Sequence, residues 1–496
     1  MFSQSAAQFG LKGNPFDSST LSASVHSLLP IATAFVGREM SSSESRTITN
    51  ILRIPGGGRF VVEWEVGVGK TTFVNYHRYL WENETQDRLL TPIQEIVVDI
   101  RWGLKEFVFN ILGALINKLV LLKGKEEAIA KDPLLREILI LTKVYSSSSI
   151  QWQGSFMGAG LGYGKNTIIT VPKISETQLV YYFQLLVQKV KEMGYAGIFL
   201  HIYNFDQISQ ENPKDMQLFF HKIRDILQIH DVYYAFVGYP GFYSQIINPI
   251  ERVRSIFFLL PIYLPPLTED KVLEAIKKRY QLLSDANFIK PVEDAFVRYL
   301  YHLYQGKFRS ILDSLSSLLS CFPPYRVGML TAQDAKEFLS QTLTQQISGV
   351  LTPKELSVLL AVSSQEECTG AEIARKLKMQ PENVSRAFKE LEKHHFIYLV
   401  KRIGTRLFYK INEQLKIIQS KTDNFPVDYK EKHTLSNLQK QFMEVLQSQE
   451  KINLTDFCQS STVPIHRIRS EVKELVRFGF IEQHGYTKGT YYTKSR

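Results

Sequence analysis

A short glycine-rich segment lies between a strand pattern and a helix pattern near the N-terminus. Residues 65–72 read EVGVGKTT; the apolar run 59–63 precedes them, and helical periodicity follows from about 70 to 81. Glycines at such a junction let backbone N–H groups surround an anion, and the first helical turn adds the positive end of its dipole. The segment therefore predicts a strand–loop–helix unit that binds phosphate groups.

Each residue type in this loop has a chemical role. Gly67 and Gly69 allow the backbone to approach a phosphate closely, and Lys70 adds a positive charge at the outer phosphates. The hydroxyl group of Thr71 is a candidate Mg²⁺ ligand, and Thr72 follows it in the helix. These five residues are the candidate site for ATP or ADP with Mg²⁺.

One position departs from the phosphate-binding pattern. The pattern GxxxxGK[ST] has glycine at position 64, where this chain has Trp64. An indole is bulky and disfavours a positive φ angle. We therefore expect either a distorted loop or a phosphate pocket that is partly filled.

The end of a second buried strand normally supplies the carboxylates of such a site. The apolar run 197–202 fits that strand, but Tyr203 and Asn204 stand where aspartate and glutamate are expected. Asp206 lies beyond them and is either a capping or surface residue or part of the site. Asn204 and Asp206 are candidate catalytic residues, and the changes at 64 and 203 suggest the hypothesis that ATP hydrolysis is impaired.

Strand and helix patterns alternate along the first half of the chain. This alternation predicts an α/β fold with a parallel sheet covered on both faces. Residues 145–172 are rich in Ser and Gly and predict a β-hairpin or loose insertion, whose role as a DNA contact, subunit contact or inert loop stays open. Strands are expected at 59–63, 95–100, 197–202, 233–238 and 257–260, helices at 104–122, 177–193 and 214–229, and further helices over 268–345.

Two compact helical units with terminal strand pairs follow, joined by the polar segment 421–432. In the first, the pattern predicts a recognition helix over 382–394 and a wing around 402–405. In the second, it predicts a first helix over 454–458 and a recognition helix over 465–478. The candidate DNA-binding residues are Asn383, Ser385, Arg386, Lys389, Arg402 and Arg406 in the first unit, and Arg467, Arg469, Lys473 and Lys488 in the second.

The charge distribution favours a polyanionic partner. The chain carries a formal net charge of +10, and residues 351–496 hold 24 Lys and Arg against 17 Asp and Glu, a net +7. The three cysteines show no CxxC pair, and no run reaches the roughly 18 apolar residues of a membrane span. With no secretory signal pattern at the N-terminus, we expect a cytoplasmic protein that binds double-stranded DNA and no membrane.

Four further segments carry a resemblance to a known family: 36–39 (VGRE), 236–240 (FVGYP), 264–268 (LPPLT) with Arg279, and 306–309 (GKFR). With the phosphate-binding loop, their order resembles the initiator-type AAA+ ATPases, including the origin-recognition initiators and related ATPases of the STAND group. The resemblance implies that Arg38 borders an adenine pocket and that Arg309 reaches the γ-phosphate. It also implies that Arg252 or Arg254 touches the nucleotide of a neighbouring subunit. That subunit would be a second copy of the chain in a homo-oligomer or a different partner protein.

The predicted fold class is α/β, with a P-loop AAA+ core containing a parallel sheet, a helical lid and two C-terminal winged-helix (α+β) domains. The expected function is a nucleotide-controlled switch or oligomeric assembly on duplex DNA. Two alternatives stay open: a pseudo-ATPase DNA-binding scaffold or transcription regulator, and a STAND-type signalling or defence ATPase whose winged helices contact protein. The expected domains are an N-terminal segment (1–58), the core (59–262), the lid (263–345) and winged helices at 350–411 and 435–496.

Overall fold

The structure, a computed structural model, divides into two compact units. The first comprises residues 1–290, 297–316 and 324–328, and the second comprises 291–296, 317–323 and 329–496. Each unit is described by itself. The residues that the structure describes are 6–21, 28–148, 174–205, 213–321, 328–420, 436–449, 451–459, 463, 465–477, 481–484 and 490–494.

A parallel sheet forms the centre of the first unit. Its strands follow the order β2-β4-β5-β1-β6, and β3 also pairs with β4. Every pairing is parallel, so the predicted sheet type is confirmed. The strands are β1 (Gly57–Glu63), β2 (Leu89–Leu90), β3 (Ile96–Val97), β4 (Gly197–Tyr203), β5 (Val232–Gly238) and β6 (Ile262–Tyr263).

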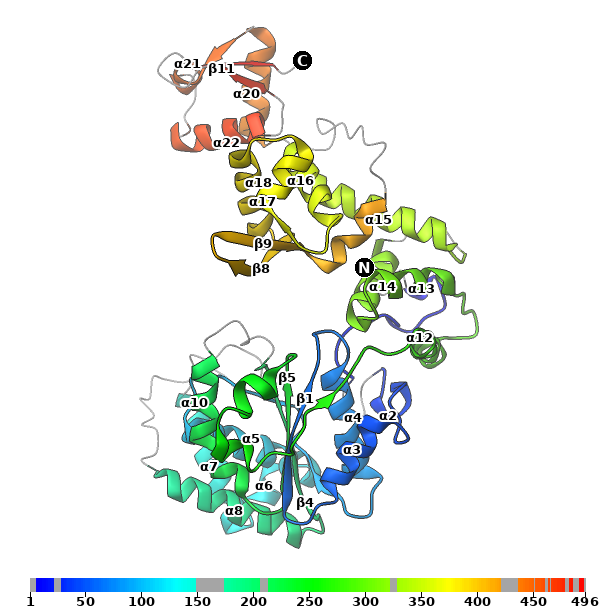
Figure 1. Ribbon diagram of the computed structural model, residues 1–496, viewed down its shortest axis with the longest axis vertical. Helices are drawn as coiled ribbons and strands as arrows, with labels where there is room; N and C mark the ends of the chain where they lie inside the picture. Colours follow the sequence, from blue (N-terminus) through cyan, green and yellow to red (C-terminus); the bar gives the residue numbers. More distant parts are fainter. Residues whose placement is uncertain are drawn as a thin grey trace. The chain divides into compact units, whose positions relative to one another are not determined.

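Helices cover both faces of this sheet (Figure 1). The helices α3 (Ser43–Leu52) and α4 (Lys70–Asn83) lie on one face. The opposite face is covered by α5 (Leu104–Lys123), α7 (Pro133–Ser148), α8 (Glu176–Glu192) and α10 (Pro213–Ile223). Because both faces are covered, the central strands are almost entirely apolar and buried.

Phenylalanine rings fill the core beneath α10. Phe205 lies directly after β4, and its ring centroid is 4.9 Å from that of Phe242. Phe220 of α10 packs 5.2 Å from Phe236 of β5. All four side chains are fully buried. Burial of several large rings is a main source of stability for the sheet region.

Several predicted boundaries in this unit are wrong. The expected strand at 257–260 is replaced by β6, because Pro261 lacks an N–H group and residues 258–260 turn their side chains to solvent. The strand expected at 95–100 is reduced to Ile96–Val97. Residues 145–148 of the expected Ser/Gly insertion belong to α7, and the rest of that insertion lies outside the described residues.

The predicted run of helices over 268–345 is confirmed. It contains α12 (Glu269–Leu283), α13 (Asp294–Leu303), α14 (Phe308–Cys321) and α15 (Ala332–Ser348). The first unit holds α12 together with most of α13 and the start of α14, whereas α15 belongs to the second unit. The side chain of Thr331 caps α15 by accepting a hydrogen bond from the Asp334 N–H group.

The first winged helix has the predicted order of elements. Its helices are α16 (Pro353–Ser363), α17 (Gly370–Leu377) and α18 (Pro381–Lys393), and its strands β7 (Cys368–Thr369), β9 (Arg406–Ile411) and β8 (Ile397–Ile403) form a sheet in that order. Thr369 caps α17, since its hydroxyl group accepts from Glu372 N–H at 3.3 Å. A 3₁₀ segment at Glu413–Ser420 follows and was not predicted.

The second winged helix has a core of its own. Its elements are α20 (Asn437–Ser448), β10 (Ile452–Asn453), α21 (Leu454–Gln459), α22 (Ile465–Arg477), β11 (Ile481–His484) and β12 (Tyr491–Lys494). The sequence prediction took α21 as the first helix, but α20 precedes it. Phe442 of α20 packs 4.8 Å from Phe457 of α21, so α20 completes this core. The expected linker at 421–432 lies outside the described residues.

Candidate nucleotide-binding and nucleic-acid-binding sites

The phosphate-binding loop joins β1 to α4 as predicted. Gly67 and Gly69 have φ angles of 92° and 96°, in the region that favours glycine. Lys70 begins α4, is buried, and donates through Nζ to the carbonyl oxygens of Trp64 at 2.7 Å and Glu65 at 3.0 Å. The lysine ammonium group is therefore held over the loop, where its charge can attract an anion.

A cavity of about 190 Å³ opens beside this loop, within the first unit. It brings together the predicted residues Gly67, Gly69, Lys70, Thr71, Thr72, Arg38 and Arg309. Its apolar wall contains Ala34, Phe35, Val36, Leu267, Ala275 and Leu312. A cationic loop with N–H donors at one part of the cavity and apolar side chains at another fit the phosphates and the base of a nucleotide.

The start of α14 is attached directly to the loop. The Arg309 N–H group donates to the Gly67 carbonyl oxygen at 3.1 Å. Lys307 Nζ forms an ion pair with the Glu65 carboxylate at 2.9 Å. Arg38 donates to the carbonyl oxygens of Val68, at 3.4 Å, and Pro265. Burial lowers the pKa of Arg38 to about 10, so its guanidinium group remains charged at neutral pH.

Trp64 does not fill the cavity. Its ring packs edge-on against Tyr263 of β6, with centroids 6.3 Å apart. It is not among the residues that line the cavity or among the described non-glycine residues with positive φ. The expectation that the indole partly fills the pocket is therefore wrong, because the neighbouring edge strand offers the ring an apolar contact.

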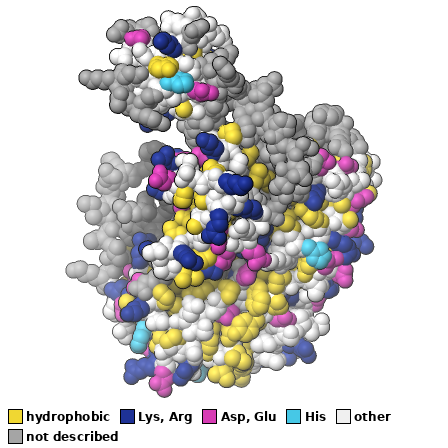
Figure 2. Space-filling view, turned by 45° about the horizontal axis from the view of Figure 1, so that its top comes forward, with side chains coloured by type: hydrophobic (Ala, Val, Ile, Leu, Met, Phe, Trp, Pro, Cys, Tyr) yellow, Lys and Arg dark blue, Asp and Glu magenta, His cyan; other side chains and the backbone are white. Residues whose placement is uncertain are grey.

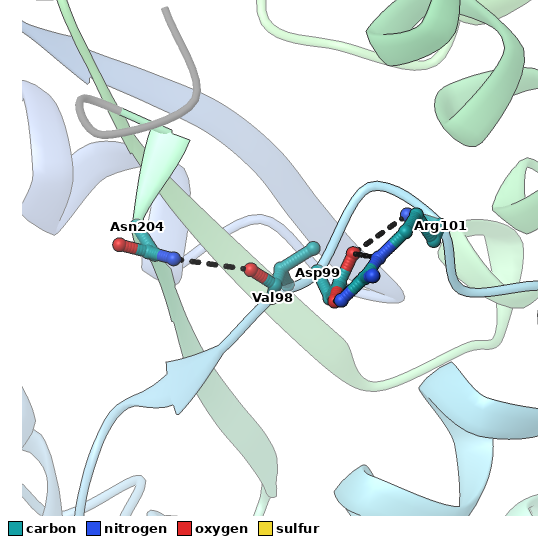
Figure 3. Close-up of polar contacts among 4 residues, drawn as sticks. All are labelled: Val98, Asp99, Arg101 and Asn204. Carbon is teal, nitrogen blue, oxygen red and sulfur yellow. Dashed lines mark hydrogen bonds and ion pairs between the residues drawn. The ribbon is translucent and has the colours of Figure 1, made fainter. Parts of the chain in front are cut away.

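Tyr203, in contrast, lines the cavity. Asn204 follows it with a φ angle of 97°, and its side-chain amide donates to the Val98 carbonyl oxygen at 3.3 Å (Figure 3). This hydrogen bond fixes the end of β4 against the segment after β3. Asp206, the other candidate catalytic residue, lies outside the described residues.

Two carboxylates near the strand ends were missed. Asp99 follows β3 and accepts hydrogen bonds from Arg101, whose guanidinium group lowers the pKa of Asp99 (Figure 3). Glu63 ends β1 and accepts from the backbone N–H groups of Gly241 and Tyr243 at 3.3 and 2.9 Å. Burial raises the pKa of Glu63 despite these bonds. An acidic residue at the end of an apolar run was the available signal for both.

Arg252 and Arg254 are not brought to the cavity. Both are exposed on α11 (Glu251–Arg254), and neither lines the cavity of its own chain. The contact with a neighbouring subunit, which the family resemblance implies for one of them, stays a prediction.

The recognition helix of the first winged helix has a buried and an exposed face. Val384, Phe388 and Leu391 of α18 are buried, as helical spacing predicts. The exposed residues that sequence reasoning singled out are Asn383, Ser385, Arg386 and Lys389 on α18, and Arg402 and Arg406 on the wing strands.

The second winged helix is described less fully. Arg469 and Lys473 are exposed on α22. The side chain of Arg467 and the whole of Lys488 lie outside the described part of the structure. Two of the four candidate DNA-binding residues in this domain are therefore placed on its surface.

A buried polar cluster links the cavity wall to the sheet. Arg78 of α4 donates to Asn75 Oδ1 at 2.8 Å, and His201 Nδ1 of β4 lies 3.1 Å from the same oxygen. Asn75 donates through Nδ2 to the Glu95 carboxylate and to the Leu21 carbonyl oxygen. Since Leu21 lines the cavity, this cluster fixes one wall of the candidate site.

Because two histidines are buried in the first unit, we expect the protein to lose stability in mild acid. Burial lowers the pKa of both His77 and His201 to about 3, below the unperturbed value of about 6.5. Between these values the unfolded chain binds protons that the native chain excludes, so stability present above pH 6.5 is lost as the pH falls. We expect each histidine to remove about 1.5 kcal/mol between pH 6.5 and pH 5, because the unfolded histidine is already half protonated at pH 6.5.

Denaturant unfolding at a series of pH values measures this loss. His77→Gln should flatten the dependence by the share of one histidine, whereas His221→Gln, at an exposed position of α10, should leave it unchanged. A dependence that is the same in His77→Gln as in the unaltered chain would contradict the assignment.

No helix among the described residues is long and apolar enough to cross a membrane. The MarR family model matches residues 351–401, which contain α16, α17, α18, β7 and most of β8. Comparison with curated proteins gives no match.

Comparison with solved structures found archaeal proteins among its matches. The ORC2 protein of Aeropyrum pernix, in ADPNP and ADP complexes, is 12% identical with a TM-score of 0.40, covering 82% of this chain and 97% of that one. The ORC1 protein of Aeropyrum pernix, in complex with DNA, is 15% identical with a TM-score of 0.38, over 79% and 94% of the two chains. Cdc6p from Pyrobaculum aerophilum is 15% identical with a TM-score of 0.34, over 78% and 95%.

The fold itself rests on the features described above: the parallel sheet, the phosphate-binding loop at the end of β1, and the helices that follow β6. The chain thus has an AAA+-type P-loop core with a helical lid, followed by two winged-helix domains, the first of which matches the MarR family model.

Proposed function

We propose that this chain binds ATP or ADP in the P-loop cavity and acts as a nucleotide-controlled switch or oligomeric assembly on duplex DNA. The observation that carries the proposal is the cavity itself. Lys70, Thr71 and Arg309 line it together with an apolar wall, which suits a charged phosphate chain attached to a flat base. The nucleotide site would lie within the core and lid, and the winged helices would hold the DNA.

Three residues of the site would have separate roles in binding the nucleotide. Lys70 would exchange the carbonyl oxygens of Trp64 and Glu65 for phosphate oxygens, because an ammonium group gains more from a charged acceptor. The backbone of Arg309 already contacts Gly67. Its guanidinium group would bind the γ-phosphate, so that the presence of this phosphate would set the position of the lid. Bound Mg²⁺ would neutralise phosphate charge, with the Thr71 hydroxyl group as a protein ligand.

We expect little ATP hydrolysis. Tyr203 lines the cavity where a metal-holding aspartate is expected, and a phenol side chain does not replace a carboxylate as a metal ligand. Tyr203→Asp should therefore raise the turnover of ATP, whereas Trp64→Gly should have little effect, because the Trp64 ring lies against Tyr263. Phosphate release assays with contaminant-free protein test this expectation. Turnover at an ordinary ATPase rate by the unaltered chain would contradict the expected low hydrolysis.

Exposed basic residues support the DNA half of the proposal. On the face drawn in Figure 2, Lys and Arg side chains lie among exposed hydrophobic ones. Arg386 and Lys389 lie exposed on α18, where they can reach phosphates in a groove. Arg386→Ala and Lys389→Ala should each weaken duplex binding and reduce the slope of affinity against salt by about one.

Fluorescence anisotropy with a labelled duplex measures this effect at several salt concentrations, with no nucleotide, with ADP and with ATP. Lys222→Ala, an exposed residue of α10 in the first unit, is the matched control. An affinity that is equal in all three nucleotide conditions would reject the switch and favour a scaffold. The specific observation that already favours a non-hydrolysing scaffold as second candidate is Tyr203 in the cavity.

A further inference from the structure

The phosphate-binding loop and the start of α14 are joined by two polar contacts. Arg309 N–H donates to the Gly67 carbonyl oxygen at 3.1 Å, and Lys307 Nζ lies 2.9 Å from the Glu65 carboxylate. The Lys307 side chain is only 15% exposed, so the ion pair is partly shielded from water. A Cβ atom at Gly67 would lie 3.4 Å from Arg309 Cβ, which shows how closely the two segments approach.

The ion pair lies at the margin of the cavity. Val66 and Phe308, the sequence neighbours of Glu65 and Lys307, line the cavity, whereas Glu65 and Lys307 do not. The pair therefore connects the two segments from outside the space that a nucleotide would occupy. The Glu65 carbonyl oxygen also accepts from Lys70 Nζ at 3.0 Å, so this one residue contacts both the lid and the phosphate-binding lysine.

We infer that Glu65 and Lys307 form a latch between the loop and the lid, which controls how fast nucleotide enters and leaves the cavity. This inference rests on the proposed nucleotide binding. The two side chains are positioning residues, because they act by holding Arg309 against Gly67. A triphosphate passing between the loop and the lid requires these segments to separate, and each passage must break the ion pair.

A latch of this kind has a kinetic signature. If the ion pair is formed both in the empty and in the nucleotide-bound protein, it stabilises the two states equally and does not change the dissociation constant. It then contributes only to the activation barrier for nucleotide entry and release. Loss of the pair should therefore raise the association and dissociation rates together, by about three- to fivefold given the modest strength of partly exposed ion pairs. The dissociation constant should change less than either rate.

Stopped-flow fluorescence with N-methylanthraniloyl-ATP and N-methylanthraniloyl-ADP tests the latch in the full-length chain. Glu65→Gln and Lys307→Gln should each accelerate binding and release, and the reversed pair Glu65→Lys with Lys307→Glu should restore slow rates. Lys191→Gln removes a lysine that pairs with Asp231 at 2.5 Å, outside the loop and lid, and should leave both rates unchanged.

A second measurement does not depend on nucleotide. Amide hydrogen exchange at Arg309 should be faster in Glu65→Gln than in the unaltered chain, because the N–H bond to Gly67 opens more often. Unchanged rates and unchanged exchange in both single variants, or a reversed pair that stays fast, would overturn the latch while leaving nucleotide binding intact. If the unaltered chain binds neither nucleotide, the proposed function fails and the inference fails with it.

Discussion

Replacing Arg78 by methionine is expected to lower the free energy of unfolding by about 3–5 kcal/mol, the usual effect of removing one partner from a buried charged cluster. Arg78 is 3% exposed and donates to Asn75 Oδ1 and to the backbone carbonyl oxygens of Pro92 and Gln94. Its guanidinium group is also one of the charges that lower the pKa of the buried Glu95 carboxylate. Methionine fills similar space but leaves these acceptors without a donor.

Denaturant titration at pH 7.5 measures this change. Arg136→Met is the matched control, because Arg136 is exposed on α7, and it should shift stability by less than about 0.5 kcal/mol. Arg78→Met should also weaken nucleotide binding, because Arg78 positions Asn75, and Asn75 holds the Leu21 carbonyl oxygen in the cavity wall. A loss below about 1 kcal/mol would mean that water or relaxation satisfies the cluster.

Lys70→Ala is expected to weaken ATP binding about a hundredfold, or roughly 2–3 kcal/mol, the range for hydrogen bonds to charged groups. Lys70 is buried and lines the cavity, and its ammonium group lies over the backbone of the phosphate-binding loop. Isothermal titration calorimetry in the presence of Mg²⁺ gives the affinity.

The control for this variant is Lys222→Ala, which removes the same charge from an exposed position of α10 and should leave the affinity unchanged. The melting temperature of Lys70→Ala separates lost binding from lost folding, because the lysine also satisfies two loop carbonyl groups. Equal ATP affinity in Lys70→Ala and the unaltered, folded chain would rule out the P-loop cavity as the binding site.

Some of the site could be predicted because its geometry is local. The loop between β1 and α4 depends on a few consecutive residues, and its two glycines adopt the positive φ angles that the pattern requires. The exposed and buried faces of α18 likewise follow from helical spacing within one element. In both cases the interactions that decide the structure join residues close together in the chain.

Other features depended on partners far away in the sequence. Trp64 avoids the cavity because Tyr263, at the edge of the sheet, offers its ring a contact. Glu63 accepts hydrogen bonds from the backbone N–H groups of Gly241 and Tyr243, which lie 178 and 180 residues further along the chain. No local pattern reveals such contacts, so sequence reasoning missed Glu63 and misjudged Trp64.

Local patterns along the chain were enough to predict the phosphate-binding loop, the alternation of strands and helices, and the buried and exposed faces of the recognition helix, because periodicity and turn chemistry act over a few residues. Packing in three dimensions brings together side chains that these patterns do not pair: the Trp64 ring with Tyr263, Lys307 with Glu65, and Arg78 with its buried cluster. Those contacts arise when the sheet and lid pack together, since burial removes water and leaves each polar group to find a protein partner.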